Sequence, residues 1–252
     1  MHRFYLPPES CAGPVLSLDG SEAHHALHVL RVRRGDTVTV LNGAGGQCLC
    51  EVQDCGRDSL NLKVFERHQI DPLPFQVTLI QALPKGKGIE AIIQKSTELG
   101  VYRLVPLLTE RVVSHLHHES SGDKTAKWRS VAVEAIKQCG STWLPQVEEP
   151  LTPEQLLSQS KSPELALVGA LEGRSKHPRE YFQSFINTQG RKPASVSVWV
   201  GPEGDFTPSE MELIQSSGVL PISLGPLVLR SETAAICSLS VIFYELRSPV
   251  GT

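Results

Sequence analysis

The sequence lacks three features, each of which would define a class of protein. No apolar run reaches the roughly 18 residues that cross a membrane, and the opening MHRFYLPPES has no apolar stretch typical of a secretory signal peptide. Basic residues are not in excess either, because 24 Lys and Arg stand against 27 Asp and Glu, for a net charge of −3. We therefore expect a cytoplasmic protein without membrane segments, in which any contact with nucleic acid comes from a local basic surface.

The six cysteines show no metal-binding pattern. None belongs to a C-x-x-C pair, and Cys48 and Cys50 share one face of a predicted strand because side chains alternate along a strand. A zinc site would need a second pair of ligands at suitable spacing. We predict reduced thiols and no metal, with a metal or redox role as the alternative.

Two prolines in Asp71-Pro72-Leu73-Pro74 indicate a linker, since proline disfavours helices and interior strands. Before it, residues 1–72 read as a small β-barrel-like domain. Its expected elements are strands at 37–41, 47–53 and 59–65 and a helix at 21–30. After it, strands alternate with helices, which is typical of a mostly parallel sheet with helices on both faces, so residues 73–252 are predicted to be an α/β domain. The strands are expected at 76–82, 104–107, 165–168 and 196–200, and the helices at 89–99, 124–139 and 233–246, with a surface helix within 150–163.

The most informative stretch is 198–236, VWVGPEGDFTPSEMELIQSSGVLPISLGPLVLRSETAAI. Each of its two loops follows an apolar strand and precedes a helix, and open α/β sheets bind ligands beyond the carboxyl ends of their strands. The G-x-x-G turn at 201–204 alone is more often a plain turn, and it is neither a dinucleotide fingerprint nor a Walker loop. The apolar 224–230 loop suits a flat heterocycle such as adenine. The helix starts are marked by Thr207, Pro208 and Glu210, which form a capping box, and by Ser231, which can cap the last helix.

Several basic segments allow two interpretations each. The 84–88 loop, PKGKG, either cradles a phosphate at a helix N-terminus or is a solvated loop. His24, His25 and His28 suit a nucleic-acid-facing edge with the arginines that follow them, and a metal pair there lacks a third ligand. The histidines of 115–118 read as a solvated cluster. The cations between 85 and 129 are either a solvated face or a surface for a phosphodiester substrate; they are Lys85, Lys87, Lys95, Arg103, Arg111, Lys124, Lys127 and Arg129.

Six motifs occur in order along the whole chain: HHALHVLRVRRGD (24–36), LPKGKG (83–88), QKSTELGV (94–101), EAIKQCG (134–140), VGPEG (200–204) and LGPLVLRSETAA (224–235). Together they resemble the RsmE family, the bacterial 16S rRNA (uracil-N3) methyltransferases of the SPOUT superfamily. The resemblance implies a PUA-like RNA-binding domain at 1–72 and a SPOUT methyltransferase domain at 73–252 whose C-terminal region forms a trefoil knot, a rare exception to unknotted topology. It also implies S-adenosylmethionine (SAM) as the cofactor and a homodimer. The implied substrate is one uridine in the decoding region of 16S rRNA. Because a chain of net charge −3 cannot hold RNA by charge alone, we expect this rRNA to be bound in the assembled small ribosomal subunit.

The resemblance also implies site residues. Arg230 is the candidate cation beside the uracil carbonyls, and Glu203 is the candidate proton acceptor or else only shapes its loop. Two residues depart from the family pattern: Asp205 replaces a usual glycine and Ser141 a usual arginine. The implied SAM-binding residues are Leu171, Gly201, Glu203, Gly204, Leu224, Gly225, Leu229, Arg230 and Thr233, and the candidate RNA contacts are Arg31, Arg33, Arg34, Lys85, Lys87 and Arg111.

Two alternatives remain open. A methyltransferase of the same superfamily could modify another RNA position, which only analysis of the product would reveal. A non-catalytic RNA-binding or ribosome-assembly protein would use the N-terminal domain and the basic face without binding SAM.

Overall fold

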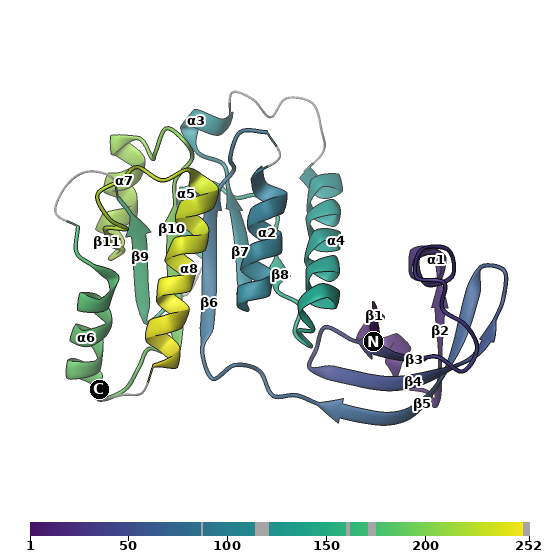
Figure 1. Cartoon of the computed structure of the whole chain (residues 1–252). Coiled ribbons are helices and arrows are strands. Elements are labelled where there is room, and N and C mark those ends of the chain that lie inside the picture. Colours follow the sequence, from purple (N-terminus) through teal and green to yellow (C-terminus); the bar gives the residue numbers. More distant parts are fainter. Residues whose placement is uncertain (87, 114–120, 160–161, 171–174, 249–252) are drawn as a thin grey trace. The chain divides into compact units, whose positions relative to one another are not determined.

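The computed structural model describes residues 1–86, 88–113, 121–159, 162–170 and 175–248 (Figure 1). The chain divides into two compact units. The first is Met1–Pro72 with Ala132–Leu144, and the second is Leu73–Val131 with Pro145–Thr252. The division after Pro72 falls within the predicted linker. Residues 132–144, expected in the second domain, pack with the first unit because the end of helix α4 (Ser121–Cys139) contacts the N-terminal segment.

The first unit is built on a five-stranded sheet with the order β1-β3-β4-β5-β2. Its strands alternate between buried and exposed residues, as in β2, where Leu16 and Leu18 are buried between exposed neighbours. The predicted helix at 21–30 begins as α-helix and continues as π-helix. The strands are β1 (His2–Tyr5), β2 (Val15–Asp19), β3 (Thr37–Leu41), β4 (Gly46–Cys55) and β5 (Ser59–Gln69), and the helices are η1 (Pro8–Cys11), α1 (Gly20–His24) and the π-helical η2 (His25–Val29).

A buried lysine fixes the end of α4 to this unit. The Lys137 side chain is 6% exposed, and its Nζ lies 2.6 Å from Glu22 Oε1 and 2.8 Å from Glu134 Oε1. Burial alone lowers the pKa of Lys137, but its hydrogen bonds to Glu134 and Glu22 outweigh this and raise it. Arg3 adds a hydrogen bond from Nη1 to the backbone oxygen of Gln138 at 3.0 Å. These contacts explain why 132–144 belongs to the first unit.

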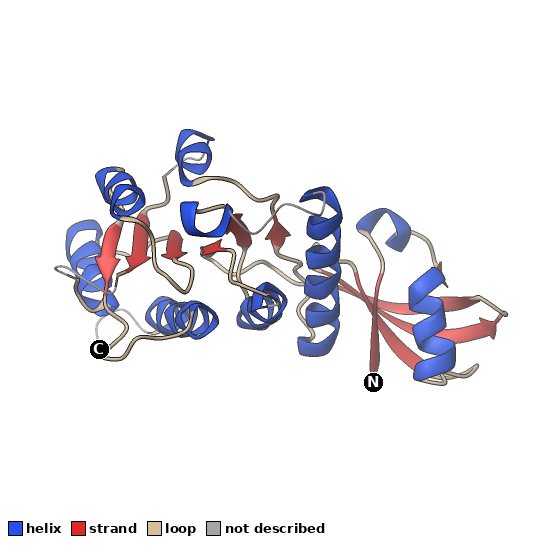
Figure 2. Cartoon of the chain, turned by 90° about the horizontal axis from the view of Figure 1, so that it is seen from above, coloured by secondary structure: helices blue, strands red, loops and turns tan. Residues whose placement is uncertain are grey.

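The second unit contains a six-stranded sheet in which every pair of neighbouring strands is parallel, with the order β11-β9-β10-β6-β7-β8. Helices cover both of its faces, as the prediction required (Figure 2). The strands are β6 (Gln76–Ala82), β7 (Arg103–Leu107), β8 (Gln146–Val147), β9 (Leu165–Gly169), β10 (Ser195–Val200) and β11 (Leu220–Ile222). The remaining helices are α2 (Gly88–Leu99), α3 (Glu110–Val113), α5 (Pro153–Gln159), α6 (Pro178–Gln189), α7 (Pro208–Ser216) and α8 (Ser231–Arg247).

The described residues show no helix long and apolar enough to cross a membrane, and no group of three or more His, Cys, Asp or Glu placed to hold a metal ion. Three cysteines of the first unit, Cys11, Cys48 and Cys50, are buried in its core, whereas Cys55 and Cys139 are exposed. Burial is the main cause that raises the pKa of Cys11 to about 11 and that of Cys50 to about 12. These thiols therefore stay protonated at neutral pH, which suits a packing role.

Candidate functional site

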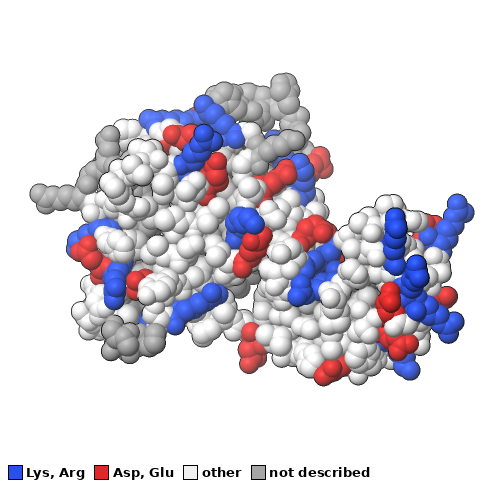
Figure 3. All heavy atoms as spheres, in the orientation of Figure 1, with Lys and Arg blue, Asp and Glu red and all other residues white. Residues whose placement is uncertain are grey.

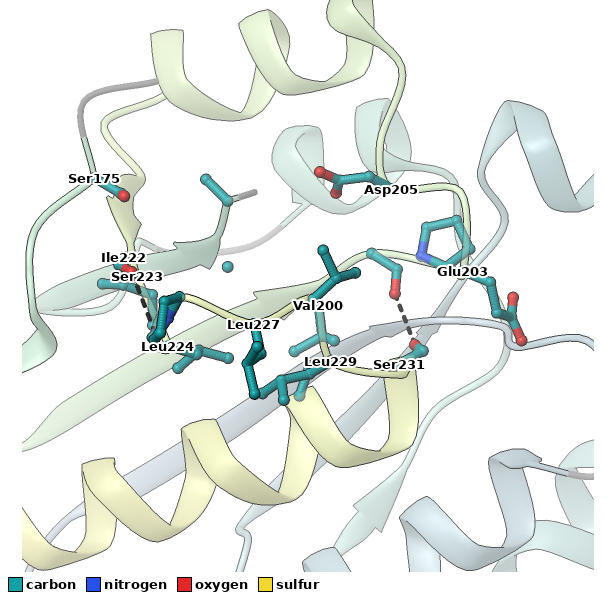
Figure 4. Close-up of a pocket in the computed structure, with 18 residues that line it drawn as sticks. Ser175, Val200, Glu203, Asp205, Ile222, Ser223, Leu224, Leu227, Leu229 and Ser231 are labelled. Carbon is teal, nitrogen blue, oxygen red and sulfur yellow. Dashed lines mark hydrogen bonds between the residues drawn. The ribbon is translucent and has the colours of Figure 1, made fainter. Parts of the chain in front are cut away.

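A pocket lies at the carboxyl ends of β9, β10 and β11, on the second unit (Figure 4). Three connections form it: the residues after Gly169, the turn after Val200 and the loop after Ile222. This is the edge where open α/β sheets bind ligands. The lining residues are Gly169, Ala170, Ser175, Val200, Gly201, Pro202, Glu203, Asp205, Ile222, Ser223, Leu224, Gly225, Pro226, Leu227, Val228, Leu229, Ser231 and Ala234.

The structure brings both predicted ligand loops into this one pocket. Of the residues implied by the resemblance, the pocket is lined by Gly201, Glu203, Leu224, Gly225 and Leu229. Gly204, Arg230 and Thr233 are exposed and lie outside the lining, while Leu171 is outside the described residues. Leu227 and Val228 belong to the 224–230 loop that was predicted to hold a ligand, whereas Ser223, just before this loop, was not predicted. Nothing in the sequence pointed to Ser175.

The turn after β10 explains the departure at Asp205. Asp205 has φ +62°, in the left-handed region where glycine is usual and Asp is among the better tolerated alternatives. The turn is closed by the backbone N–H of Asp205, which donates to the Pro202 carbonyl at 2.9 Å, and Asp205 Oδ1 accepts from Phe206 N at 2.8 Å. The aspartate therefore adopts the backbone conformation that a glycine would supply.

Side chains from distant elements hold this turn. The Ser231 hydroxyl donates to the Gly201 carbonyl at 2.7 Å, Glu203 Oε1 accepts from the backbone N–H of Lys85 at 2.9 Å, and Arg111 Nη1 donates to the Asp205 carbonyl at 3.2 Å.

The predicted capping role of Ser231 is wrong. Ser231 is the first residue of α8, and its hydroxyl is committed to Gly201 while the N-cap residue makes no side-chain capping bond. The capping box predicted for α7 is present: Thr207 Oγ1 accepts from Glu210 N at 3.3 Å, and Glu210 Oε2 from Thr207 N at 2.8 Å.

The loop after β11 combines a glycine at positive φ with exposed apolar side chains. Gly225 has φ +117°, which side-chain-bearing residues rarely adopt. Its backbone N–H donates to Ser223 Oγ at 3.3 Å. Leu227 and Val228 are 75% and 77% exposed, so the rim of the pocket is apolar. Exposed apolar groups beside a pocket are typical of a surface that a ligand or partner covers.

The candidate RNA contacts occur in both units. In the first unit Arg31, Arg33 and Arg34 are exposed, and Arg31 has φ +56° just after the π-helical turn. The imidazoles of His24 and His28 lie beside them in sequence with ring centroids 4.8 Å apart. In the second unit Lys85 and Arg111 are exposed, and Lys87 and His115–His118 lie outside the described residues. Figure 3 shows that charges of both signs are interspersed on the visible face of each unit.

Ser141, the second departure, closes a turn. Its Oγ donates to the Trp143 carbonyl at 2.9 Å and accepts from Trp143 N at 3.2 Å. A serine at this position therefore supports the backbone after α4 instead of presenting a cation.

Models of two families match the chain: an RNA methyltransferase PUA domain over residues 18–65 and an RNA methyltransferase domain over residues 71–243. The fold, the pocket and these matches define the class as RNA methyltransferases with a PUA domain. The ribosomal RNA small subunit methyltransferase E of Synechocystis is 35% identical over 98% of this chain and 78% of its own length. That of Bacillus subtilis is 31% identical over 92% and 91%. The chain therefore belongs to the ribosomal RNA small subunit methyltransferase E family.

Solved structures agree with this placement. The Neisseria gonorrhoeae member of the family, bound to S-adenosyl methionine, has a TM-score of 0.82 at 25% identity and covers 96% of each chain. A methyltransferase structure from Legionella pneumophila with bound SAM has a TM-score of 0.82 at 32% identity, covering 95% of this chain and 96% of its own.

Proposed function

We propose that this chain transfers the methyl group of SAM to N3 of one uridine in the decoding region of 16S rRNA. The observation that carries the proposal is the pocket in which the glycine turn and the apolar loop meet at the carboxyl edge of the sheet. Its residues fit SAM, because Leu224, Leu227 and Leu229 offer apolar walls for an adenine while Gly201 and Gly225 allow a ligand to approach the backbone. When bound there, SAM supplies an electrophilic methyl group.

The chemistry asked of the protein is mainly positioning. Well-oriented reactants can save roughly 7–11 kcal/mol of the barrier. Uracil N3 loses its proton to water, and a guanidinium close by stabilises the negative charge that develops on the uracil carbonyls. We assign this role to Arg230, the exposed N-cap residue of α8 beside the pocket lining. The target base has to be unpaired or extruded, because N3 is hidden in a Watson–Crick pair.

We propose that Glu203 shapes the site and does not take the proton. Its carboxylate accepts a hydrogen bond from Lys85 N at 2.9 Å, and its side chain points away from Leu224 and Leu227 (Figure 4). Glu203→Gln keeps an acceptor oxygen for Lys85 N, so we expect its kcat to stay within about twofold of wild type. Glu203→Ala removes the acceptor and should lower kcat/KM about tenfold, the effect of losing roughly 1.4 kcal/mol. Steady-state methyl transfer to small subunits measures both.

A carboxylate that acts as the proton acceptor predicts the opposite pattern. Glu203→Gln would then lose at least as much activity as Glu203→Ala, because an amide cannot take up the proton. The pair of variants thus separates the two roles that the sequence left open.

We further propose a homodimer with the pocket near its interface. The apolar residues Ala235, Leu239 and Ile242 of α8 pack into the chain's own core and so do not support a second partner. Support comes instead from Tyr244, 69% exposed, with the exposed Leu227 and Val228 of the pocket loop. Figure 3 shows a broad area without Lys, Arg, Asp or Glu over the middle of α8. Such an apolar surface suits a homodimer interface.

The dimer proposal predicts a particle of twice the chain's 27.5 kDa in light scattering at micromolar concentration. Tyr244→Glu with Leu227→Glu should convert it to a monomer, because it places charges in the apolar contact. A wild-type chain that remains monomeric over this concentration range rules the dimer out.

The SPOUT-type trefoil knot is also a proposal. It is supported by the meeting of the loops after β9, β10 and β11 and by the Ser231–Gly201 bond that holds the start of α8 against the turn. A crystal structure of this chain in which no segment passes through a loop between residues 165 and 248 would contradict the knot.

Transfer of a labelled methyl group from SAM tests the function. We expect 16S rRNA in isolated small subunits to be labelled and deproteinised short RNA fragments to remain unlabelled, because many phosphate contacts have to position one uridine. The substrate would also place the protein in the cytoplasm. If the protein binds small subunits but neither binds SAM nor transfers its methyl group, it is instead an assembly factor.

A further inference from the structure

A fully buried glutamine hydrogen-bonds toward the pocket from behind it. Gln81 lies near the end of β6, is 0% exposed, and donates from Nε2 to Ser231 Oγ at 2.9 Å. Ser231, 3% exposed, donates in turn to the Gly201 carbonyl at 2.7 Å (Figure 4). The same Gln81 nitrogen also donates to the Ala82 carbonyl at 2.8 Å, so both of its protons are used. Three segments far apart in sequence are joined by this chain of hydrogen bonds.

The direction of the chain follows from the groups involved. An amide nitrogen donates only, so Ser231 Oγ accepts from Gln81 and its single proton is left for the Gly201 carbonyl. Buried hydrogen bonds in series polarise and strengthen one another. The carbonyl they hold belongs to the first peptide of the turn that lines the pocket.

Helix stability does not account for the Ser231 hydroxyl. The N-cap of α8 is Arg230, which makes no side-chain capping bond, and the Ser231 hydroxyl donates its only proton to the Gly201 carbonyl. Gln81 does not line the pocket, whereas Ser231 and Gly201 do. The buried amide therefore acts on the pocket only through the hydroxyl.

We propose that Gln81 is a positioning residue for SAM, which sets the Gly201 turn through Ser231. The inference rests on the proposed function. It assigns a reason for an amide side chain in a parallel strand whose neighbours are apolar, since an apolar residue at position 81 would leave the Ser231 hydroxyl free to rotate away from Gly201.

Calorimetric SAM binding by the full chain tests the proposal. Ser231→Ala and Gln81→Leu should each weaken SAM binding about tenfold, and the double variant should be no weaker than Ser231→Ala alone, because both changes break the same chain of bonds. Ser231→Thr keeps a hydroxyl and should restore affinity to within about threefold of wild type.

Ser238→Ala is the matched control. Ser238 lies in the same helix, is 0% exposed, and its hydroxyl has no hydrogen-bond partner among the described residues. The Ser238→Ala variant should bind SAM with wild-type affinity. If Ser231→Ala and Gln81→Leu melt at a lower temperature but bind SAM with wild-type affinity while folded, the bonds serve stability alone and the inference is wrong. Should Gln81→Leu fail to fold, Ser231→Ala and Ser231→Thr decide it. A wild-type chain that binds no SAM would instead overturn the proposed function.

Discussion

Gly225→Val is expected to abolish SAM binding while the protein stays folded. Gly225 has φ +117°, and a β-branched residue at such an angle is a strong outlier whose strain costs about 1–3 kcal/mol. The loop would relieve the strain by changing its path, and the backbone and apolar groups that line the pocket would move with it. We expect affinity to fall at least a hundredfold in calorimetry.

Gly218→Val provides the matched control. Gly218 also has positive φ, +90°, and a Cβ there would likewise meet nothing within 4 Å, but it lies in the turn between α7 and β11, outside the pocket lining. It should lose a similar amount of stability and keep SAM affinity. If Gly225→Val and Gly218→Val both bind SAM with wild-type affinity, the 224–230 loop is not the cofactor site.

The double variant Arg31→Ala with Arg33→Ala is expected to weaken binding to small subunits about tenfold or more and to leave SAM binding intact. Both arginines are exposed in the first unit, and the 201–205 turn and the 224–230 loop belong to the second. Each lost phosphate contact should lower the slope of log affinity against log salt by roughly 0.7 to 0.9. Filter binding at several salt concentrations measures the slope, and calorimetry measures SAM affinity.

A control variant with the same loss of charge tests whether the position of the arginines or only the total charge of the unit determines RNA binding. Arg57→Ala with Lys63→Ala removes two exposed cations from the same unit but outside the 24–36 segment. We expect a smaller loss of affinity. If the two double variants weaken binding equally, the 31–34 arginines are not a specific anchor and the first unit attracts RNA through its overall charge.

Much of the second unit was predictable because its strands are short, continuous and apolar. Val196–Val200 and Leu165–Val168 are confirmed as strands, each extended by one residue, since period and length identify such segments without help from packing. Helix α6 was missed although Pro178 and Glu180 fit a helix start, because its N-cap is His177, which is not among the usual capping residues. The predicted helix at 21–30 switches to π-helix at His25, a change that no sequence periodicity signals.

The two loops of the candidate site could be predicted from the sequence, but the hydrogen bonds that hold them in place could not. Glycines and apolar residues mark the 201–204 turn and the 224–230 loop in sequence. The partners that fix them are far away, as Gln81 is from Ser231 and Lys85 from Glu203, and only the parallel order of the strands brings them together. For the same reason Ser231 was mistaken for a cap: its sequence position fits one, and its true partner is thirty residues earlier.

The methylated nucleoside in the product defines the reaction most directly. Small ribosomal subunits that lack this methyl group should be incubated with the protein and SAM, and their 16S rRNA digested to nucleosides for mass spectrometry. We expect one 3-methyluridine per subunit, formed with wild type and absent with Gly225→Val. A methyl group on any other atom or nucleoside, or no methylated product from a chain that binds SAM, would contradict this expectation.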